Sequence, residues 1–214
     1  MSGSIYKLNI KMPKEDLMLL NSIDKKVVLV KENSESSGNS NGFIDEVAWV
    51  TFQLWGDNKV TWENKYSVYV SETQKQSGAV IEKASWEEAE PKTKMYSFNN
   101  GYFMGEQFSG ESHPTAYYVK NNYYKPETFG LAQSVKVGEK LYEANPINAM
   151  TVLNNEQAYF IPIEKIKVFL AARAENGKVI SVAQSQALLL DFTEKSEITI
   201  TYDRSTSKFI VVEE

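Results

Sequence analysis

Residues 163–185, IEKIKVFLAARAENGKVISVAQS, decide the fold class of this chain. Two runs rich in Ile, Val and Phe flank the dipeptide Asn176-Gly177, which is typical of a type I′ turn in a β-hairpin. We therefore expect a hairpin here, with strands on both sides of ENGK. Three more strand-like runs follow: LLLDFT (188–193), EITITYD (197–203) and KFIVVE (208–213).

The chain before this stretch also alternates apolar and polar residues. EVAWVTFQLW (46–55) and KVTWENKYSVYV (59–70) show the period of two of half-buried strands, and residues 56–58, GDN, predict a hairpin between them. About a dozen short strands with turn signals every 8–12 residues are typical of an antiparallel β-sandwich. We expect one mainly β domain over 1–214. The other predicted strands are 79–84, 93–98, 116–124, 132–137, 147–153 and 157–161.

The N-terminal segment 4–31 predicts a strand–helix–strand unit. Its first strand alternates through Tyr6, Leu8, Ile10 and Met12. A helix is expected after Pro13, because proline suits the first helical turn, and VVLVK (27–31) predicts the second strand. Residues 32–42, ENSESSGNSNG, are small and polar, which indicates a flexible surface loop.

Composition excludes several functional classes. The formal net charge is −5, so phosphate neutralisation along a nucleic acid is not expected. The chain has no cysteine, which excludes disulfides and thiolate-bound zinc. The start resembles no signal peptide, and no apolar run has the length of a transmembrane helix. We expect a cytoplasmic protein as synthesised, with later release left open.

Residues for catalysis are sparse. The only histidine is His113, in a polar loop, and no sequence pattern supplies a partner for it. Glu87, Glu88 and Glu90 cluster without a diagnostic spacing. We expect no enzyme, no cofactor and no metal; a hydrolase that uses loop carboxylates is the enzymatic alternative. A calcium site built from loop oxygens would leave no linear motif.

Aromatic residues concentrate in residues 96–130, which hold 10 of the 26 aromatics in the chain. Asn100-Gly101 predicts a hairpin turn that places Phe98 opposite Tyr102. In AYYVKNNYY (116–124), both phases of the alternation carry tyrosines. One strand face is expected to enter the core, which leaves two tyrosines exposed on the other face unless a loop or a partner covers it.

The loop GEQFSGESHPT (105–115) lies between these strands. Tyrosine is favoured where one end of a side chain is apolar and the other is wet, as at glycan-binding faces and protein interfaces. Long loops on a rigid β scaffold commonly carry recognition residues. The candidate ligand-binding residues are Tyr102, Phe103, Phe108, His113, Tyr117, Tyr118, Asn121, Asn122, Tyr123 and Tyr124.

The C-terminal strands carry a resemblance to a known family. The matching residues are Pro162, Ile163, Glu164, Lys165 and Ile166, followed by Leu190, Asp191, Phe192 and Thr193. The segment KMPKEDLMLL (11–20) and the tryptophans and tyrosine from Trp49 to Tyr66 are also similar. The chain thus resembles a largely uncharacterised family of β-rich proteins of similar length from fungi and soil bacteria. The resemblance implies a compact β-rich fold and no established activity.

We expect a non-enzymatic surface-binding protein, lectin-like or cytolysin-like. The aromatic segment would contact a glycan or lipid surface of a target cell, with Asn121 and Asn122 donating hydrogen bonds. The alternative is a structural or self-assembling protein, a homo-oligomer that uses the tyrosine-rich sheet face as its interface.

Overall fold

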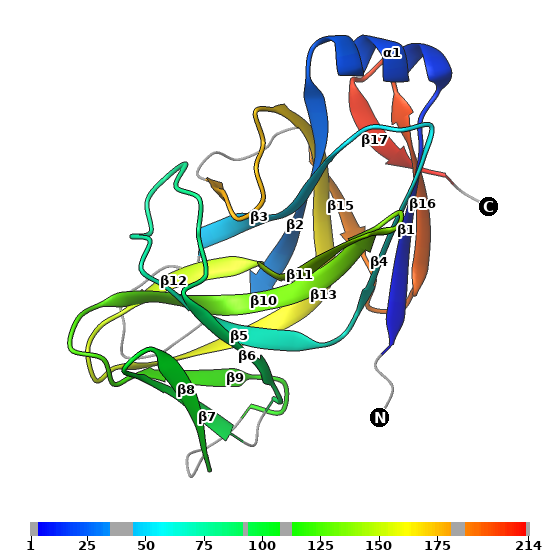
Figure 1. The fold of residues 1–214 in the computed structure, drawn as a ribbon. Coiled ribbons are helices and arrows are strands. Elements are labelled where there is room, and N and C mark those ends of the chain that lie inside the picture. The colour runs from blue at the N-terminus through cyan, green and yellow to red at the C-terminus, as the bar shows by residue number, and fades with distance from the viewer. Residues whose placement is uncertain (1–3, 35–44, 92–93, 108–112, 181–186, 213–214) are drawn as a thin grey trace.

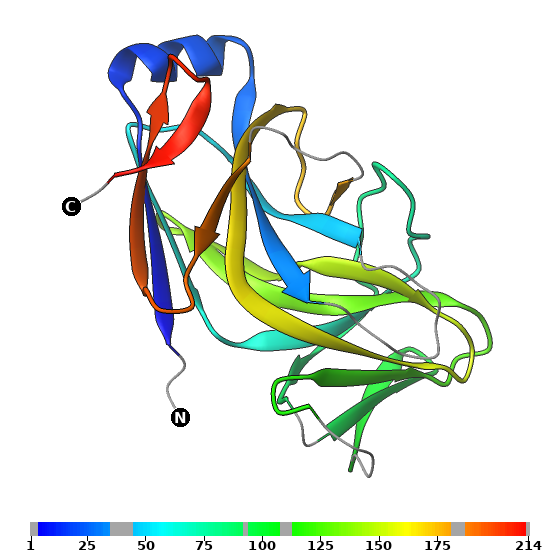
Figure 2. The same cartoon turned by 180° about the vertical axis from the view of Figure 1, so that it is seen from behind.

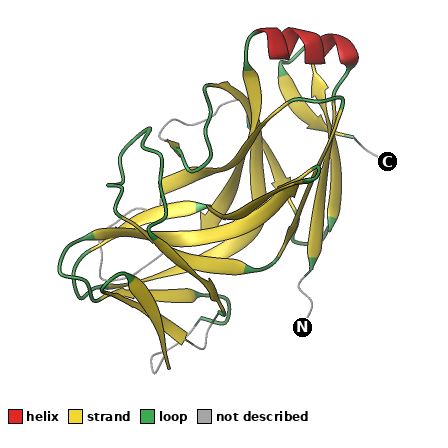
Figure 3. Cartoon of the chain, in the orientation of Figure 1, coloured by secondary structure: helices red, strands yellow, loops and turns green. Residues whose placement is uncertain are grey.

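The computed structural model describes residues 4–34, 45–91, 94–107, 113–180 and 187–212 (Figure 1). These residues form a mainly β structure with a single helix, α1 (Lys14–Ser22) (Figure 3). The strands are β1 (Ile5–Lys11), β2 (Lys25–Ser34), β3 (Asp45–Gln53), β4 (Asp57–Glu63), β5 (Tyr66–Ser71), β6 (Ser85–Ala89), β7 (Lys94–Asn99), β8 (Tyr102–Gln107), β9 (Tyr117–Asn121), β10 (Glu127–Val137), β11 (Lys140–Pro146), β12 (Asn148–Val152), β13 (Gln157–Ala172), β14 (Val179–Ile180), β15 (Leu188–Asp191), β16 (Glu197–Asp203) and β17 (Lys208–Val211).

Backbone pairing connects the strands into one large mixed sheet. On one side, β1 lies between β16 and β4, and β10 continues from β4 to β5 and β12. On the other, β13 lies between β15 and β2, and β2 pairs with β3. The small β8–β7–β9 sheet joins the first half of β13 through β9 and lies at the end opposite α1 (Figures 1 and 2).

The predicted antiparallel character is only partly correct. Two pairs are parallel: β1 with β16, and β7 with β9. Parallel partners require long connections, and β1 and β16 come from opposite ends of the chain. The N-terminal strand is therefore held by one of the last strands, a pairing that no local pattern could reveal.

The predicted hairpin between 46–55 and 59–70 is wrong. β3 pairs with β2, β12 and β14, whereas β4 pairs with β1 and β10, so residues 54–56 cross between two parts of the sheet. The run 59–70 is also divided, because the chain leaves the ladder between β4 and β5.

The hairpin predicted around Asn176-Gly177 is also wrong. β14 pairs with β3, not with β13. Gly177 has a φ of 77°, but Asn176 has no positive φ, and a type I′ turn requires positive φ at both central residues. Residues 181–185 of the predicted second strand lie outside the described residues.

Other predictions are confirmed or corrected locally. The helix after Pro13 is confirmed, as is the β7–β8 hairpin, although Phe98 pairs with Phe103 and not with Tyr102. The segment 79–84 contains a single isolated bridge at Val80, and β6 and β11 were not predicted. Residues 32–34 of the predicted loop 32–42 belong to β2, and the rest of that prediction lies outside the described residues.

One main hydrophobic cluster fills the interior. It draws on inward-facing residues of both halves, for example Leu8 and Val60 from one and Leu29 and Val168 from the other. The helix covers one end of this cluster with Leu20, while Met18 and Leu19 stay exposed. The apolar residues of the alternating pattern therefore point into one core, where they meet apolar residues from strands that are not neighbours in the sequence.

Candidate functional site

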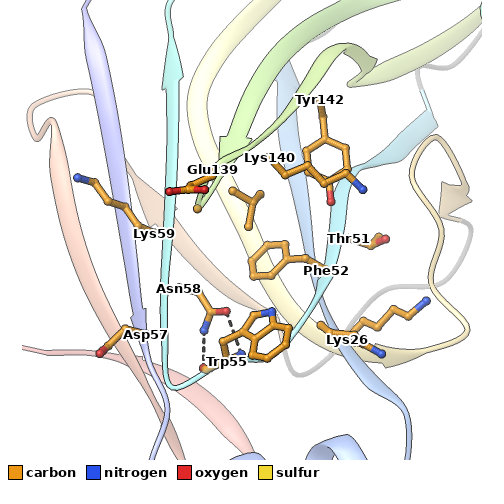
Figure 4. A pocket seen from close by; sticks show the side chains of 13 residues that line it. Lys26, Thr51, Phe52, Trp55, Asp57, Asn58, Lys59, Glu139, Lys140 and Tyr142 are labelled. Atoms are coloured by element: carbon orange, nitrogen blue, oxygen red, sulfur yellow. Dashed lines mark hydrogen bonds between the residues drawn. The ribbon is translucent and has the colours of Figure 1, made fainter.

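An open cleft of about 550 Å³ lies where β3 ends, β4 begins and the β10–β11 turn approaches them (Figure 4). Its most prominent side chain is Trp55, which is 68% exposed. Large aromatic side chains are usually well buried, so this exposure calls for a structural explanation. The cleft is lined by Lys26, Thr51, Phe52, Gln53, Trp55, Asp57, Asn58, Lys59, Val137, Gly138, Glu139, Lys140 and Tyr142.

Hydrogen bonds hold the backbone around Trp55, although its ring is exposed. The buried Asn58 side chain accepts a hydrogen bond from the Trp55 N–H at 3.0 Å and donates to the Trp55 carbonyl at 2.8 Å (Figure 4). The same amide donates to the Ile10 carbonyl at 3.4 Å. Asn58 therefore connects residues 54–56, which we call the Trp55 loop, to β1.

Two further hydrogen bonds hold the residues on either side of Trp55. Asn21 at the end of α1 donates from Nδ2 to the Leu54 carbonyl at 3.2 Å. The backbone N–H of Met12 donates to the Gly56 carbonyl at 2.9 Å. The strand–helix–strand unit at the N-terminus thus acts as the brace of the Trp55 loop.

The cleft combines an apolar wall with a charged rim. Phe52 belongs to the hydrophobic core, and Val137 and Tyr142 pack against that core. Lys140 Nζ lies 4.6 Å from the centre of the Tyr142 ring, within the range of a cation–π contact. Lysines 26, 59 and 140 supply donors, and Asp57 and Glu139 supply acceptors.

Most of the predicted aromatic site lies elsewhere, in the small β7–β9 sheet and the connection that follows β9. Tyr102, Tyr124 and His113 are exposed, and Asn122 and Tyr123 are half-buried. Tyr123 and Tyr124 contact each other, with ring centroids 4.4 Å apart. Phe108 lies outside the described residues.

The remaining four predicted residues are buried: Phe103, Tyr117, Tyr118 and Asn121. Of the tyrosines predicted on one face of 116–124, Tyr118 is buried because β9 is covered on both faces, whereas Tyr124 lies beyond the end of β9 and is exposed. Tyr117 packs against Tyr66, and Tyr118 packs against Tyr159.

Asn121 has a structural role inside the fold. Its Nδ2 donates to the carbonyls of Lys125 and Val152, each at 2.9 Å, and its Oδ1 accepts from the Tyr123 N–H. These bonds organise the connection from β9 to β10. The Asn121 amide is thus already engaged within the chain.

The core also holds a charged pair that the sequence did not predict. Lys31 Nζ lies 2.7 Å from Glu164 Oε2 and is placed 5.2 Å and 5.1 Å from the ring centres of Trp49 and Trp62. Glu164 sits at a bulge in β13, where the register against β2 shifts. It also accepts hydrogen bonds from the Tyr66 hydroxyl and, at 3.4 Å, from Trp62 Nε1.

Burial sets the protonation of this centre. It raises the pKa of Tyr66, and the nearby Glu164 carboxylate adds to the effect, so the phenol keeps its proton. Burial also lowers the pKa of Lys31, while the attraction of Glu164 opposes that change. The arrangement is a satisfied polar network inside the core.

Within the described residues, no group of three or more His, Cys, Asp or Glu side chains is placed to hold a metal ion. No helix in that part of the chain is long and apolar enough to cross a membrane. Comparison with models of protein families, with curated proteins and with solved structures found no match. The resemblance of the C-terminal strands therefore stays a hypothesis.

Proposed function

We propose that this protein is a non-enzymatic, lectin-like protein that binds a glycan at the Trp55 cleft. One observation carries the proposal: Trp55 presents an open indole face, while its own backbone N–H and carbonyl are both bonded to Asn58. An exposed ring on a braced loop is organised for binding before the ligand arrives. Such preorganisation reduces the entropy lost on association.

The chemistry of the cleft matches that of a sugar ring. A pyranose has an apolar C–H face that can stack on an indole, and hydroxyl groups that both donate and accept hydrogen bonds. Among the lining residues, Lys26 and Lys140 carry donors, and Asp57 and Glu139 carry acceptors; Lys26 Nζ also donates to the Ala174 carbonyl at 3.5 Å. The volume of about 550 Å³ lies within the usual range of small-ligand sites.

This proposal moves the binding surface away from residues 101–130. In that segment the exposed aromatics Tyr102 and Tyr124 lie outside the residues that line the Trp55 cleft. Tyr124 is 74% exposed, similar to Trp55, and is therefore a matched control.

The test is a glycan array probed with the wild-type protein and with the variants Trp55→Ala and Tyr124→Ala. We expect the wild type and Tyr124→Ala to retain the same glycans, and Trp55→Ala to lose about tenfold or more in affinity, since stacking on one aromatic contributes roughly 1–3 kcal/mol. Equal retention of wild type and Trp55→Ala would contradict the proposal, as would no retention of the wild type on any glycan.

Two further measurements test the two alternative functions. Cosedimentation with neutral and anionic lipid vesicles, in the absence of glycan retention, would favour a lipid-binding, cytolysin-like protein. A concentration-independent oligomer in light scattering, weakened by Tyr118→Ala with Tyr124→Ala, would favour a self-assembling protein. The burial of Tyr118 against Tyr159 reduces the support for that second reading.

We also propose that the mainly β fold is, more specifically, a β-sandwich of two layers. The strands β1, β4, β5 and β10 form one layer, and β2, β3, β13 and β15 form the other. What supports two layers is the composition of the main core cluster, which takes inward residues from both sets.

A further inference from the structure

A second cavity, of about 970 Å³, lies beside the break between β4 and β5. It shares no lining residue with the Trp55 cleft. Four of its lining residues are buried aromatics, each 5% exposed or less: Trp62, Tyr66, Tyr96 and Tyr117. Trp86 and Leu141, which also line it, are exposed. The lining therefore combines buried aromatic residues with residues that face solvent.

The three tyrosine hydroxyls in this cavity differ in their hydrogen bonds. The Tyr66 hydroxyl donates to Glu164, and the Tyr96 hydroxyl accepts from the Glu90 N–H at 2.8 Å. The Tyr117 hydroxyl makes no hydrogen bond with any residue in the described part of the chain. The hydroxyl is also not among the fully buried polar atoms that lack a partner, so it is open to the cavity that Tyr117 lines, and an acceptor brought by a ligand can bond to it.

The charged residues of the lining nearly cancel, so they do not favour an anionic ligand: four are glutamates (63, 88, 90 and 143) and three are lysines (65, 94 and 136). Glu164 lies directly behind Tyr66, and its negative potential reaches Tyr117. Burial, together with Tyr96 and this carboxylate, raises the pKa of Tyr117, so its hydroxyl remains a donor at neutral pH. A neutral acceptor such as a carbonyl oxygen suits this donor.

We propose that this cavity binds a neutral, ring-containing apolar molecule with one carbonyl oxygen, which accepts a hydrogen bond from the Tyr117 hydroxyl. The rings of the ligand stack against the aromatic residues of the lining, where offset and edge-to-face contacts are favourable. The volume is at the upper end of the range for small-molecule sites. This site is separate from the glycan site and does not depend on it.

The probes are 9-fluorenone and fluorene, two rigid molecules that differ by the carbonyl group alone. Equilibrium dialysis measures the binding of each to the wild type, to Tyr117→Phe and to the control Tyr124→Phe. We expect the wild type to bind fluorenone more tightly than fluorene. Tyr117→Phe should lower the affinity for fluorenone about two- to tenfold and leave fluorene unchanged, because one hydrogen bond is lost. Tyr124→Phe should change neither affinity.

Three results would overturn the inference: no binding of either probe to the wild type, equal affinity of the wild type for both, or an equal loss of both in Tyr117→Phe. A urea titration of Tyr117→Phe checks that the variant is folded. Fluorenone binding by Trp55→Ala separates this inference from the glycan proposal. The variant should keep wild-type affinity for fluorenone, whether or not the protein binds a glycan.

Discussion

Three of the four tryptophans, at positions 49, 55 and 62, lie close together in the chain but in two different environments. Trp49 and Trp62 are buried, contact each other edge to face at 5.6 Å, and enclose the Lys31 ammonium. Trp55 is exposed, and no described residue forms a ring or cation–π contact with it. The same residue type therefore packs in the core at positions 49 and 62 and lies on the surface at position 55.

Trp49 and Trp55 differ in which of their groups form contacts within the protein. The Trp49 indole N–H donates to the Gln133 carbonyl at 2.9 Å, and the Lys31 ammonium and the Trp62 ring contact its indole. At Trp55 the fold satisfies the backbone and leaves the ring to solvent. A buried aromatic stabilises the protein, and an exposed aromatic on a fixed backbone is available for a ligand.

The largest expected effect comes from replacing the two kinds of tryptophan by alanine. Trp49→Ala should lower the free energy of unfolding by about 3–5 kcal/mol, because it leaves a cavity in the core and removes the donor to Gln133. Trp55→Ala should change it by less than about 0.5 kcal/mol. Urea denaturation followed by circular dichroism measures both.

Trp49→Phe is the fallback if the alanine variant does not fold. It keeps part of the ring and removes the indole N–H, so its loss should lie between those of the two alanine variants. Equal losses for Trp49→Ala and Trp55→Ala would remove the distinction between the two environments.

The next effect tests the ion pair that the buried tryptophans enclose. Lys31→Met should destabilise the protein by about 3 kcal/mol, since Glu164 would stay buried without its cation. The control is Lys165→Met, which removes the exposed partner of Asp191 and should cost about 1 kcal/mol or less. Both are read from urea midpoints.

A double variant sharpens this test. Replacing Glu164 by Gln in the Lys31→Met background removes the orphaned charge and keeps an acceptor for Tyr66. The double variant should be more stable than Lys31→Met alone. If it is less stable, the loss in Lys31→Met does not come from the unpaired carboxylate.

The amino-acid sequence predicts the elements better than their partners. Alternation identified the strands around Trp49 and Trp62, because an inward-facing side chain at every second position is a local property. The partners depend on the whole chain. β3 and β4 join different parts of the sheet, although a turn-like GDN segment connects them.

The buried charged pair and the candidate cleft were harder to predict from the sequence, for the same reason. Lys31 and Glu164 are 133 residues apart, so nothing local indicates that they meet. Aromatic density pointed to 101–130, but β9 is covered on both faces and much of that density is core. The available signal for Trp55 was a tryptophan at the end of a strand pattern, directly before Gly56-Asp57-Asn58.

A smaller effect concerns the brace that distinguishes Trp55 from the buried tryptophans. Asn58→Ala removes the bonds to both the N–H and the carbonyl of Trp55 and should lower the free energy of unfolding by about 1–2 kcal/mol. Under the proposed function, the freed loop should also bind a glycan more weakly. Urea denaturation and the glycan array measure these two changes, and unchanged stability would show that the brace does not hold the loop.

The smallest effect belongs to the exposed pair beside the buried one. Hydrogen bonds from Thr193, together with Lys165, lower the pKa of Asp191 to about 2 from 3.8. A carboxyl whose pKa is lower in the folded state stabilises the protein above its unfolded pKa, and this contribution is lost as the pH falls towards the folded value. The free energy of unfolding of Asp191→Asn should therefore lie below that of the wild type at about pH 5, and the difference should shrink as the pH falls from 3.8 to about 2. Urea titrations at several pH values test this, and a difference that is constant over that interval would contradict it.

Because Asp191 is open to solvent, a large difference in the free energy of unfolding is not expected. This small effect distinguishes the exposed pair of Lys165 and Asp191 from the buried pair of Lys31 and Glu164.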